Sequence, residues 1–234
     1  MFKESPQIEY PADSRQILWR YMPSEHLKEL LQTEKLYFRN LHCLPDGLEG
    51  RLTKRSREHC AKWFHINHRY TWEKAYDAVI KYENAQKDFY VNCWHMNMHE
   101  SYLMWKVYSQ KNGYAIRTTY ERIKLAPCEI TGGKVKYVDF ENEGTSIGNL
   151  FDHVATKDKP YEDEREFRLV YWDLKTNTDI VKDSESALIP VNLGMLIKSI
   201  VVGPNVSAAD SEVDRLIEEK NITIEYSNIS ERRT

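Results

Sequence analysis

The chain has 234 residues, of which 41% are hydrophobic and 29% charged, so it can bury a core and does not have the composition of a disordered protein. Its formal net charge of -3 argues against a protein whose whole face binds nucleic acid, although it allows a local basic patch. No segment has the character of a signal peptide or a membrane span, which predicts a cytoplasmic protein that does not enter a membrane.

We expect one globular domain over residues 1–234, with flexible ends at 1–15 and 228–234, because no linker-like composition divides the chain. The four cysteines lack CxxC spacing, which indicates reduced thiols and no cysteine zinc site.

The first elements predict a strand, helix, strand unit. Residues 16–22 alternate like a strand that Pro23 ends, Ser24 suits a helix N-cap, and leucines recur at helical spacing up to residue 32. A second strand is expected at 36–38. In the loop that follows it, Asp46 and Glu49 either cap the loop or line a cleft at the strand ends.

Residues 57–87 predict helix, with a break near Asn67. A stripe at helical spacing is expected to be buried, and it consists of Trp72, Ala75, Tyr76, Val79 and Ile80. The basic run before it, Arg51 to Arg57, is either a solvated helix start or a phosphate-facing patch. His59, His65 and His68 lack a carboxylate or fourth ligand at suitable spacing, so we expect no metal there.

Further strands are expected at 88–94 and 114–119, in a hairpin over 128–140 around Gly132-Gly133, and near 178–182, 187–191, 199–202 and 222–227. Helices are expected at 101–109, 149–155 and 207–220. Because helices are grouped early and strands dominate later, the sequence predicts an α+β fold with a mixed or antiparallel sheet.

A dense run of charge passes directly into an apolar run at residues 157–172. In an extended chain, Glu164, Glu166 and Arg168 share one face, whereas Phe167 and Leu169 face the core. Two carboxylates and a guanidinium held where a strand leaves the interior can perform chemistry, or they can form a strand-edge salt-bridge ladder.

The chain contains a series of motifs: LWRYM, LYFRN, a PDGLEG loop, VNCW followed by ESYLMW, YAIRTT, and K-x-Y-x-x-E-x-E-x-R at 159–168. This series resembles a large prokaryotic domain-of-unknown-function family, the one numbered 2971, over most of the chain. Pro45-Asp46-Gly47 departs from the family's asparagine-aspartate-proline form, which weakens a role for Asp46. The family and its abortive-infection-like relatives look like genes of mobile elements, so the resemblance implies phage defence or a toxin system without an assigned reaction.

A second similarity is to the ADP-ribosyltransferase fold, with Arg20 in the first strand, Tyr37 in the second and the E-x-E of Glu164 and Glu166 at a late strand. It implies an enzyme that uses NAD, in which Glu166 stabilises the developing ribosyl cation and Glu164 meets a protein or nucleic-acid acceptor. Arg20 would bind the diphosphate of NAD.

Tyr37, Arg168 and Trp105 complete the expected cofactor site, where Trp105 is either a cleft wall or core. This hypothesis places the 16–38 unit beside the strand of Glu166, with Arg20 in the same cleft.

Two alternatives remain open. A nuclease could bind magnesium through Asp139, Glu164 and Glu166, with phosphates held near Arg55. A non-catalytic module that senses or binds a nucleotide-type small molecule would use Glu164, Glu166 and Arg168 only as a structural network.

Overall fold

The computed structural model describes residues 2, 4, 8–109, 112–125, 130–172, 180–204, 206 and 210–229. The helices in this part of the chain are α1 Ser24–Thr33, α2 Lys54–Asn67, α3 Trp72–Glu83, α4 Tyr102–Tyr108, α5 Tyr120–Lys124, α6 Leu150–Val154, α7 Leu193–Leu196 and α8 Ser211–Glu219. Three 3-10 helices are η1 Leu41–Cys43, η2 Asn84–Asp88 and η3 Lys159–Glu164. No helix in the described ranges is both long and apolar enough to span a bilayer.

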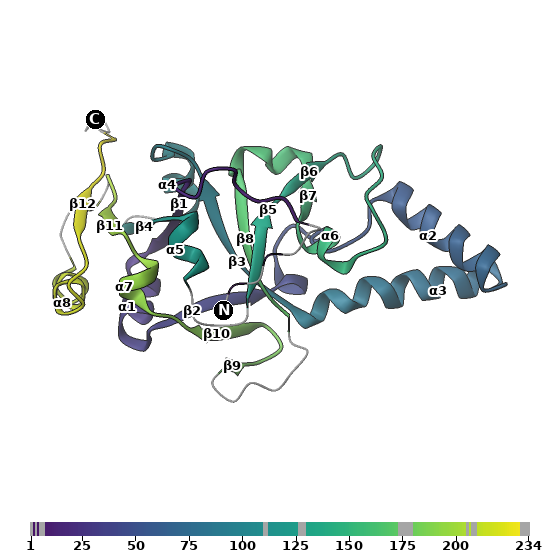
Figure 1. Ribbon diagram of the computed structural model, residues 1–234, viewed down its shortest axis with the longest axis horizontal. Helices are drawn as coiled ribbons and strands as arrows, with labels where there is room; N and C mark the ends of the chain where they lie inside the picture. The colour runs from purple at the N-terminus through teal and green to yellow at the C-terminus, as the bar shows by residue number, and fades with distance from the viewer. Residues whose placement is uncertain are drawn as a thin grey trace.

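The strands are β1 Ile17–Pro23, β2 Lys35–Asn40, β3 Phe89–Met96, β4 Gly113–Thr119, β5 Thr131–Lys134, β6 Lys136–Val138, β7 Thr156–Asp158, β8 Glu166–Trp172, β9 Val181–Lys182, β10 Ser186–Pro190, β11 Ser199–Val202 and β12 Ile224–Tyr226. Ten of them form one mixed sheet in the order β12-β11-β4-β1-β3-β2-β10-β9, with β8 paired to β3 and β5 paired to β8 (Figure 1). The α+β class and the mixed sheet are therefore as expected.

The central strand for the candidate site is β3. It pairs with β1 at Trp19 and His95, with β2 at Arg39 and Val91, and with β8 through seven residue pairs that include His95 and Glu166. The β1–α1–β2 unit thus lies one strand away from β8. The expectation that this unit packs directly beside the strand of Glu166 was wrong, because β3 is inserted between them.

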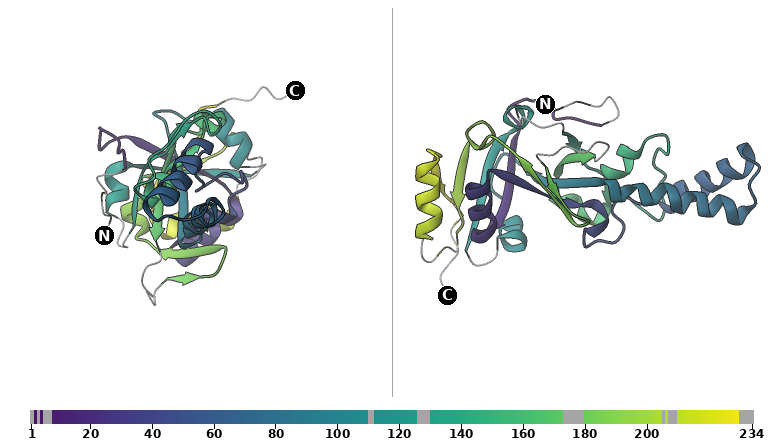
Figure 2. Two further views of the ribbon diagram at one scale, coloured as in Figure 1. Left: turned by 90° about the vertical axis from the view of Figure 1, so that its right-hand side faces the viewer. Right: turned by 90° about the horizontal axis from the view of Figure 1, so that it is seen from below.

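The main hydrophobic core covers one face of the sheet. Leu18, Trp94 and Phe167 project into it from β1, β3 and β8, and α1, α5, α7 and α8 cover it with their own apolar residues (Figure 2). The opposite face carries smaller clusters, one beneath α4 and one beneath α6. The candidate site lies on this second face.

The expected hairpin over 128–140 is replaced by two strands with different partners. Residues 126–129 lie outside the described part, β5 pairs with β8, and β6 pairs with β7. Gly132 and Gly133 do not form the turn; they let β5 lie close to its neighbours, because a Cβ at Gly132 would lie 2.5 Å from the Arg168 carbonyl and one at Gly133 2.0 Å from Ile8.

We expected residues 1–15 to be flexible, but several of the described residues in this range pack against the body. Phe2 and Ile8 are buried, and the Tyr10 ring stacks on Tyr120 at 6.1 Å. Of the expected 207–220 helix and 178–182 strand, residues 207–209 and 178–179 lie outside the described part. At α1, the N-cap is Pro23 rather than Ser24, which is the first helical residue.

The chain between β2 and β3 forms a helical hairpin, α2 and α3, that projects from the sheet (Figure 1). The two helices bury Cys60, Ala61, Ala75 and Val79 between them. The expected buried stripe on α3 was wrong at Trp72, Tyr76 and Ile80, which are 50%, 46% and 48% exposed. No third element covers these three side chains within the described chain.

Candidate functional site

Arg168 is the centre of a buried ion-pair network. Its Nε donates to Glu166 Oε1 at 2.8 Å, and its Nη2 donates to Glu166 Oε2 at 3.0 Å. On the other side, Nη1 and Nη2 donate to the two oxygens of Glu49 at 2.8 and 3.2 Å, and Nη1 also donates to the Val154 carbonyl at 2.7 Å. All five N–H groups of a fully buried guanidinium are thereby used.

Lys157 is the second cation of the network. Its Nζ lies 2.7 Å from Glu164, 3.2 Å from Glu49 and 3.6 Å from Glu166. Tyr108 of α4 donates its hydroxyl proton to Glu164 Oε1 at 3.1 Å. Three carboxylates and two cations leave one net negative charge, and Glu164 is the member that meets solvent, with 22% of its side chain exposed.

The electrostatics of the network favour its charged form. Burial alone would raise the pKa of Glu166, but the adjacent Arg168 guanidinium outweighs burial and holds the pKa at about 2. Burial likewise opposes a charged Lys157, and the Glu166 and Glu49 carboxylates outweigh it and raise the pKa of Lys157 above its usual range. The groups stabilise one another as ions.

Glu166 has little capacity left for a substrate. It is 3% exposed, and both of its oxygens accept from Arg168 while Oε2 also faces Lys157. A carboxylate that stabilises a developing cation must be aimed at the reacting atom. This geometry is the one expected of the salt-bridge alternative.

Glu164 and Glu166 do not share a strand face as expected. Glu164 ends η3, Arg165 adopts a left-handed conformation with φ of 41°, and β8 begins only at Glu166. The turn breaks the strand alternation, so the two carboxylates approach Lys157 from different directions. They are brought together by the lysine rather than by the strand.

Arg20 is not part of the expected cleft. Its neighbours Trp19 and Tyr21 belong to the cluster beneath α4, so alternation places Arg20 on the main-core face, opposite to Glu166. Its Nη2 donates to the Tyr37 carbonyl at 3.4 Å. The Tyr37 side chain, 39% exposed, does lie on the face of Glu166, because its neighbours Leu36 and Phe38 enter the main core.

Trp105 is core. It is 2% exposed, its ring meets Tyr21 edge-on at 4.8 Å, and its Nε1 donates to Glu100 Oε2 at 3.0 Å. Asp139, proposed for the nuclease, instead accepts hydrogen bonds from Glu141 and Asn142 in an exposed turn. No cluster of three His, Cys, Asp or Glu suited to a metal occurs in the residues that the structure describes.

Two members of the network were missed as site residues. Of the two loop carboxylates, Asp46 caps the loop by accepting from the backbone of Leu48 and Glu49, whereas Glu49 pairs with Arg168. Lys157 opens the charged run at 157–168 and is nevertheless buried. For Lys157 the available signal was its position at the start of the charged run that contains E-x-E-x-R, and for Glu49 it was an acidic residue in the loop after the second strand.

A groove of about 270 Å³ lies farther along the same sheet face. The strand register runs in one row from Glu166 on β8 through His95 on β3 and Trp19 on β1 to Arg117 on β4. Three strand spacings separate the two ends of this row by about 14 Å. Trp19, Arg117, Glu100 and Glu225 are among the residues that line the groove, and Trp19 and Arg117 are neighbours on its β-sheet face.

The Arg117 guanidinium has only some of its N–H donors paired with acceptors among the described residues. Its Nη1 donates to both oxygens of Glu225 at 3.1 and 2.8 Å, and the guanidinium lies over the Trp19 ring at 5.6 Å. Its Nε is shielded from solvent and has no acceptor among the described residues. An acceptor that reaches Nε from the groove also meets Nη2, because the two N–H bonds lie parallel on one edge of the planar group.

Glu100 holds the opposite side of the groove. Its Oε2 accepts from Trp105 and from the Ser227 hydroxyl, and its Oε1 accepts from the Asn228 amide at 2.9 Å. The core indole therefore fixes a carboxylate that in turn fixes the segment after β12.

A comparison with protein-family models found no match, and a comparison with curated proteins found none either, so both resemblances remain predictions.

Proposed function

We propose that the protein is a non-catalytic module that binds a nucleotide-type small molecule in the groove beside Arg117. The observation that carries the proposal is that Arg117, which lines a groove of about 270 Å³, has a shielded Nε without an acceptor among the described residues. A shielded donor without an acceptor costs roughly 1–3 kcal/mol, which a ligand acceptor recovers on binding.

The charges of the groove select the kind of acceptor. Glu100 and Glu225 lie in the same groove as Arg117, so a doubly charged phosphate meets net repulsion. A neutral pair of adjacent acceptors avoids that cost. The N7 and O6 edge of guanine has this form and pairs with one edge of a guanidinium. We therefore assign a guanine-type base as the ligand's recognised part.

The size of the groove supports the same choice. It lies near the lower limit of small-molecule pockets, and so suits a nucleoside better than the whole of NAD. In a phage-defence protein, which the family resemblance implies, such a site would report the level of a nucleotide.

Calorimetry with guanosine, adenosine, cytidine and uridine tests the proposal. We expect the wild type to prefer guanosine, and Arg117→Gln to weaken binding at least tenfold, which is the loss of a two-donor contact. The matched control is Arg215→Gln, because Arg215 is an exposed arginine whose one ion pair among the described residues is with Glu219 on the same helix. Absence of binding to all four nucleosides would exclude this function, as would unchanged affinity in Arg117→Gln.

The NAD-dependent transferase is separated from this function by turnover. With labelled NAD, we expect neither transfer to an acceptor nor hydrolysis, because the Glu166 carboxylate is already paired with the Arg168 guanidinium. If the wild type turns over NAD and the Glu166→Gln variant folds normally but does not, the transferase hypothesis would replace the binding-module hypothesis.

A further inference from the structure

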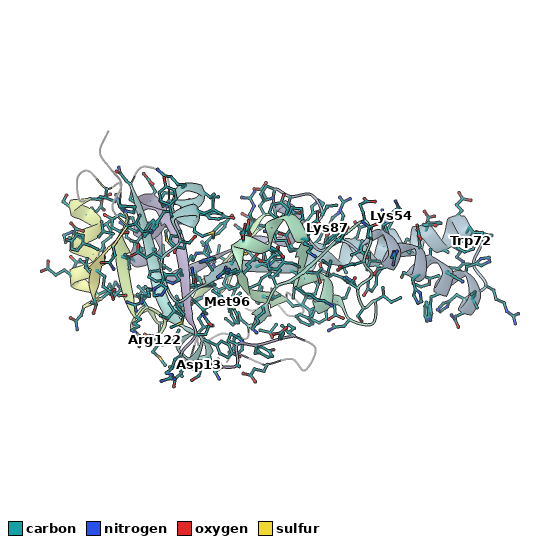
Figure 3. All side chains as sticks on the ribbon, turned by 90° about the horizontal axis from the view of Figure 1, so that it is seen from above. Asp13, Lys54, Trp72, Lys87, Met96 and Arg122 are labelled. Carbon is teal, nitrogen blue, oxygen red and sulfur yellow. The ribbon has the colours of Figure 1, made fainter. Side chains whose placement is uncertain are left out.

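The α2–α3 hairpin is a projection that the sheet does not need for its core. It leaves the body near Lys54, returns near Lys87 and reaches its tip near Trp72 (Figure 3). Helix α2 buries only Ser56, Cys60 and Ala61. Most of its surface faces solvent along its whole length.

One row of α2 combines cations with an exposed indole. Arg55, His59, Lys62, Trp63 and Ile66 follow the spacing i, i+4, i+7, i+8 and i+11, which places them on one helix face. All five are exposed, Trp63 by 45% and Ile66 by 60%. These five residues include no carboxylate, and the exposed Glu58 lies at the edge of the row, three residues after Arg55 and four before Lys62.

The hairpin is basic within an acidic chain. Residues 51–83 hold eight Lys and Arg against four Asp and Glu, a net charge of +4, whereas the whole chain has -3. Arg57 pairs with Glu83, and Lys54 pairs with Glu141. Arg55 and Lys62 form no ion pair with any described residue, so their charges are available to a partner.

We infer that this row of α2 is a docking surface for single-stranded nucleic acid, a binding site independent of the nucleotide groove. Arg55 and Lys62 lie two helical turns apart, about 10 Å along the axis, and bind phosphates. The Trp63 ring lies beyond Lys62, toward the C-terminal end of α2, and stacks on an unpaired base. A duplex hides its base faces and so leaves the indole unused.

Two other partners fit the row less well. A helix that lies in a membrane surface needs a wide apolar face, whereas Trp63 and Ile66 are the only apolar members of this row. The centre of a protein interface is depleted of lysine, whereas Lys62 lies at the centre here. Single-stranded nucleic acid fits the row better, because its phosphates can pair with the cations and its bases can stack on the exposed Trp63 ring.

Fluorescence anisotropy with a labelled 20-residue oligothymidine tests the inference. We expect binding at low salt that weakens steeply as salt is raised, by counterion release. Trp63→Ala is expected to weaken binding about tenfold at every salt concentration, because it removes one stacked base. Arg55→Gln with Lys62→Gln is expected to reduce the salt slope by about 1.4, which is about 0.7 for each phosphate contact on a single strand.

The controls are Tyr102→Ala, an exposed ring on α4, and Lys198→Gln, an exposed cation on the body, neither of which should alter binding. Equal affinity of the α2 variants and the wild type would overturn the inference, as would equal binding of a blunt duplex of the same length. Vesicles of anionic lipid serve as the competing probe, and capture by vesicles without oligothymidine binding would assign the row to a membrane instead. Guanosine binding should be unchanged in the α2 variants, so failure here is distinct from failure of the groove.

Discussion

Arg168 and Glu166 lie two residues apart on β8 and are joined by two hydrogen bonds, 2.8 Å from Nε and 3.0 Å from Nη2. Residues at i and i+2 of a strand project from the same face, so the E-x-R motif contains its own ion pair. What the motif lacks is a second carboxylate for the far side of the guanidinium. Glu49, 119 residues away in sequence, supplies it and thereby ties the loop after η1 to the sheet.

Glu166→Gln is expected to destabilise the fold by about 3 kcal/mol, because Arg168 keeps its charge in a fully buried position after losing one partner. Urea unfolding at pH 7 measures the change. Glu164→Gln is the matched control, with an expected loss below about 1 kcal/mol, because that side chain is 22% exposed. Equal stability of Glu166→Gln and the wild type would contradict the structural role of the network.

Acid should weaken the fold through the buried His153. Burial lowers the pKa of His153 to about 4, whereas an unfolded histidine titrates near 6.5. Between these values the unfolded chain binds more protons than the folded chain, so stability falls as the pH drops through this window, by about 2 kcal/mol at pH 4.5. Urea midpoints at pH 7 and pH 4.5 measure it. In His153→Gln the difference between the two midpoints should shrink; a difference as large as in the wild type would assign the effect to other groups.

Trp105 is expected to contribute through packing and through one hydrogen bond. Trp105→Ala should cost about 4 kcal/mol, as large aromatic truncations in a core do. Trp105→Phe keeps most of the ring but leaves Glu100 without its indole donor, for a loss of about 1–2 kcal/mol. Thermal unfolding measures both, and a Trp105→Ala variant as stable as the wild type would show that Trp105 is not core.

Arg20→Met is expected to leave stability unchanged or to raise it by about 1 kcal/mol. Burial lowers the pKa of Arg20 to about 10, and no carboxylate in the described ranges pairs with its guanidinium. Methionine retains the apolar stem without the charge. Chemical denaturation decides the sign. A clear loss of stability would show that the charge is compensated, and loss of nucleotide binding in a stable variant would restore Arg20 to a ligand site.

The elements with strong local patterns could be predicted from sequence. The alternation in β1, the aromatic and β-branched composition of β3, the Asn-Gly turn before β4 and the leucine spacing in α1 each indicated the right type of element near the right residues. Strand partners could not be predicted, because a strand pattern does not specify its neighbour. Gly132-Gly133 has the composition of a turn, and only the closeness of Ile8 and Arg168 shows why glycine is required there.

The candidate site was predictable only in part. E-x-E-x-R identified Glu164, Glu166 and Arg168 as neighbours, but the pattern cannot show whether carboxylates face a substrate or a guanidinium. The groove has no sequence signature, since Trp19, Arg117 and Glu225 come from three strands that are far apart in the sequence. The prediction that Trp72, Tyr76 and Ile80 of α3 are buried failed for another reason. Helical spacing identifies an apolar stripe without saying how much of it a partner helix covers.

The insertion of the hairpin between two paired strands has a consequence for folding kinetics. Asn40 at the end of β2 pairs with Tyr90 near the start of β3, so these strands must meet across fifty positions of chain. The entropy lost on closing such a loop grows with its length, and early docking of α2 on α3 shortens the flexible part. Changes at Ala61 or Ala75 that loosen the two helices should therefore slow the assembly of a sheet that neither residue touches.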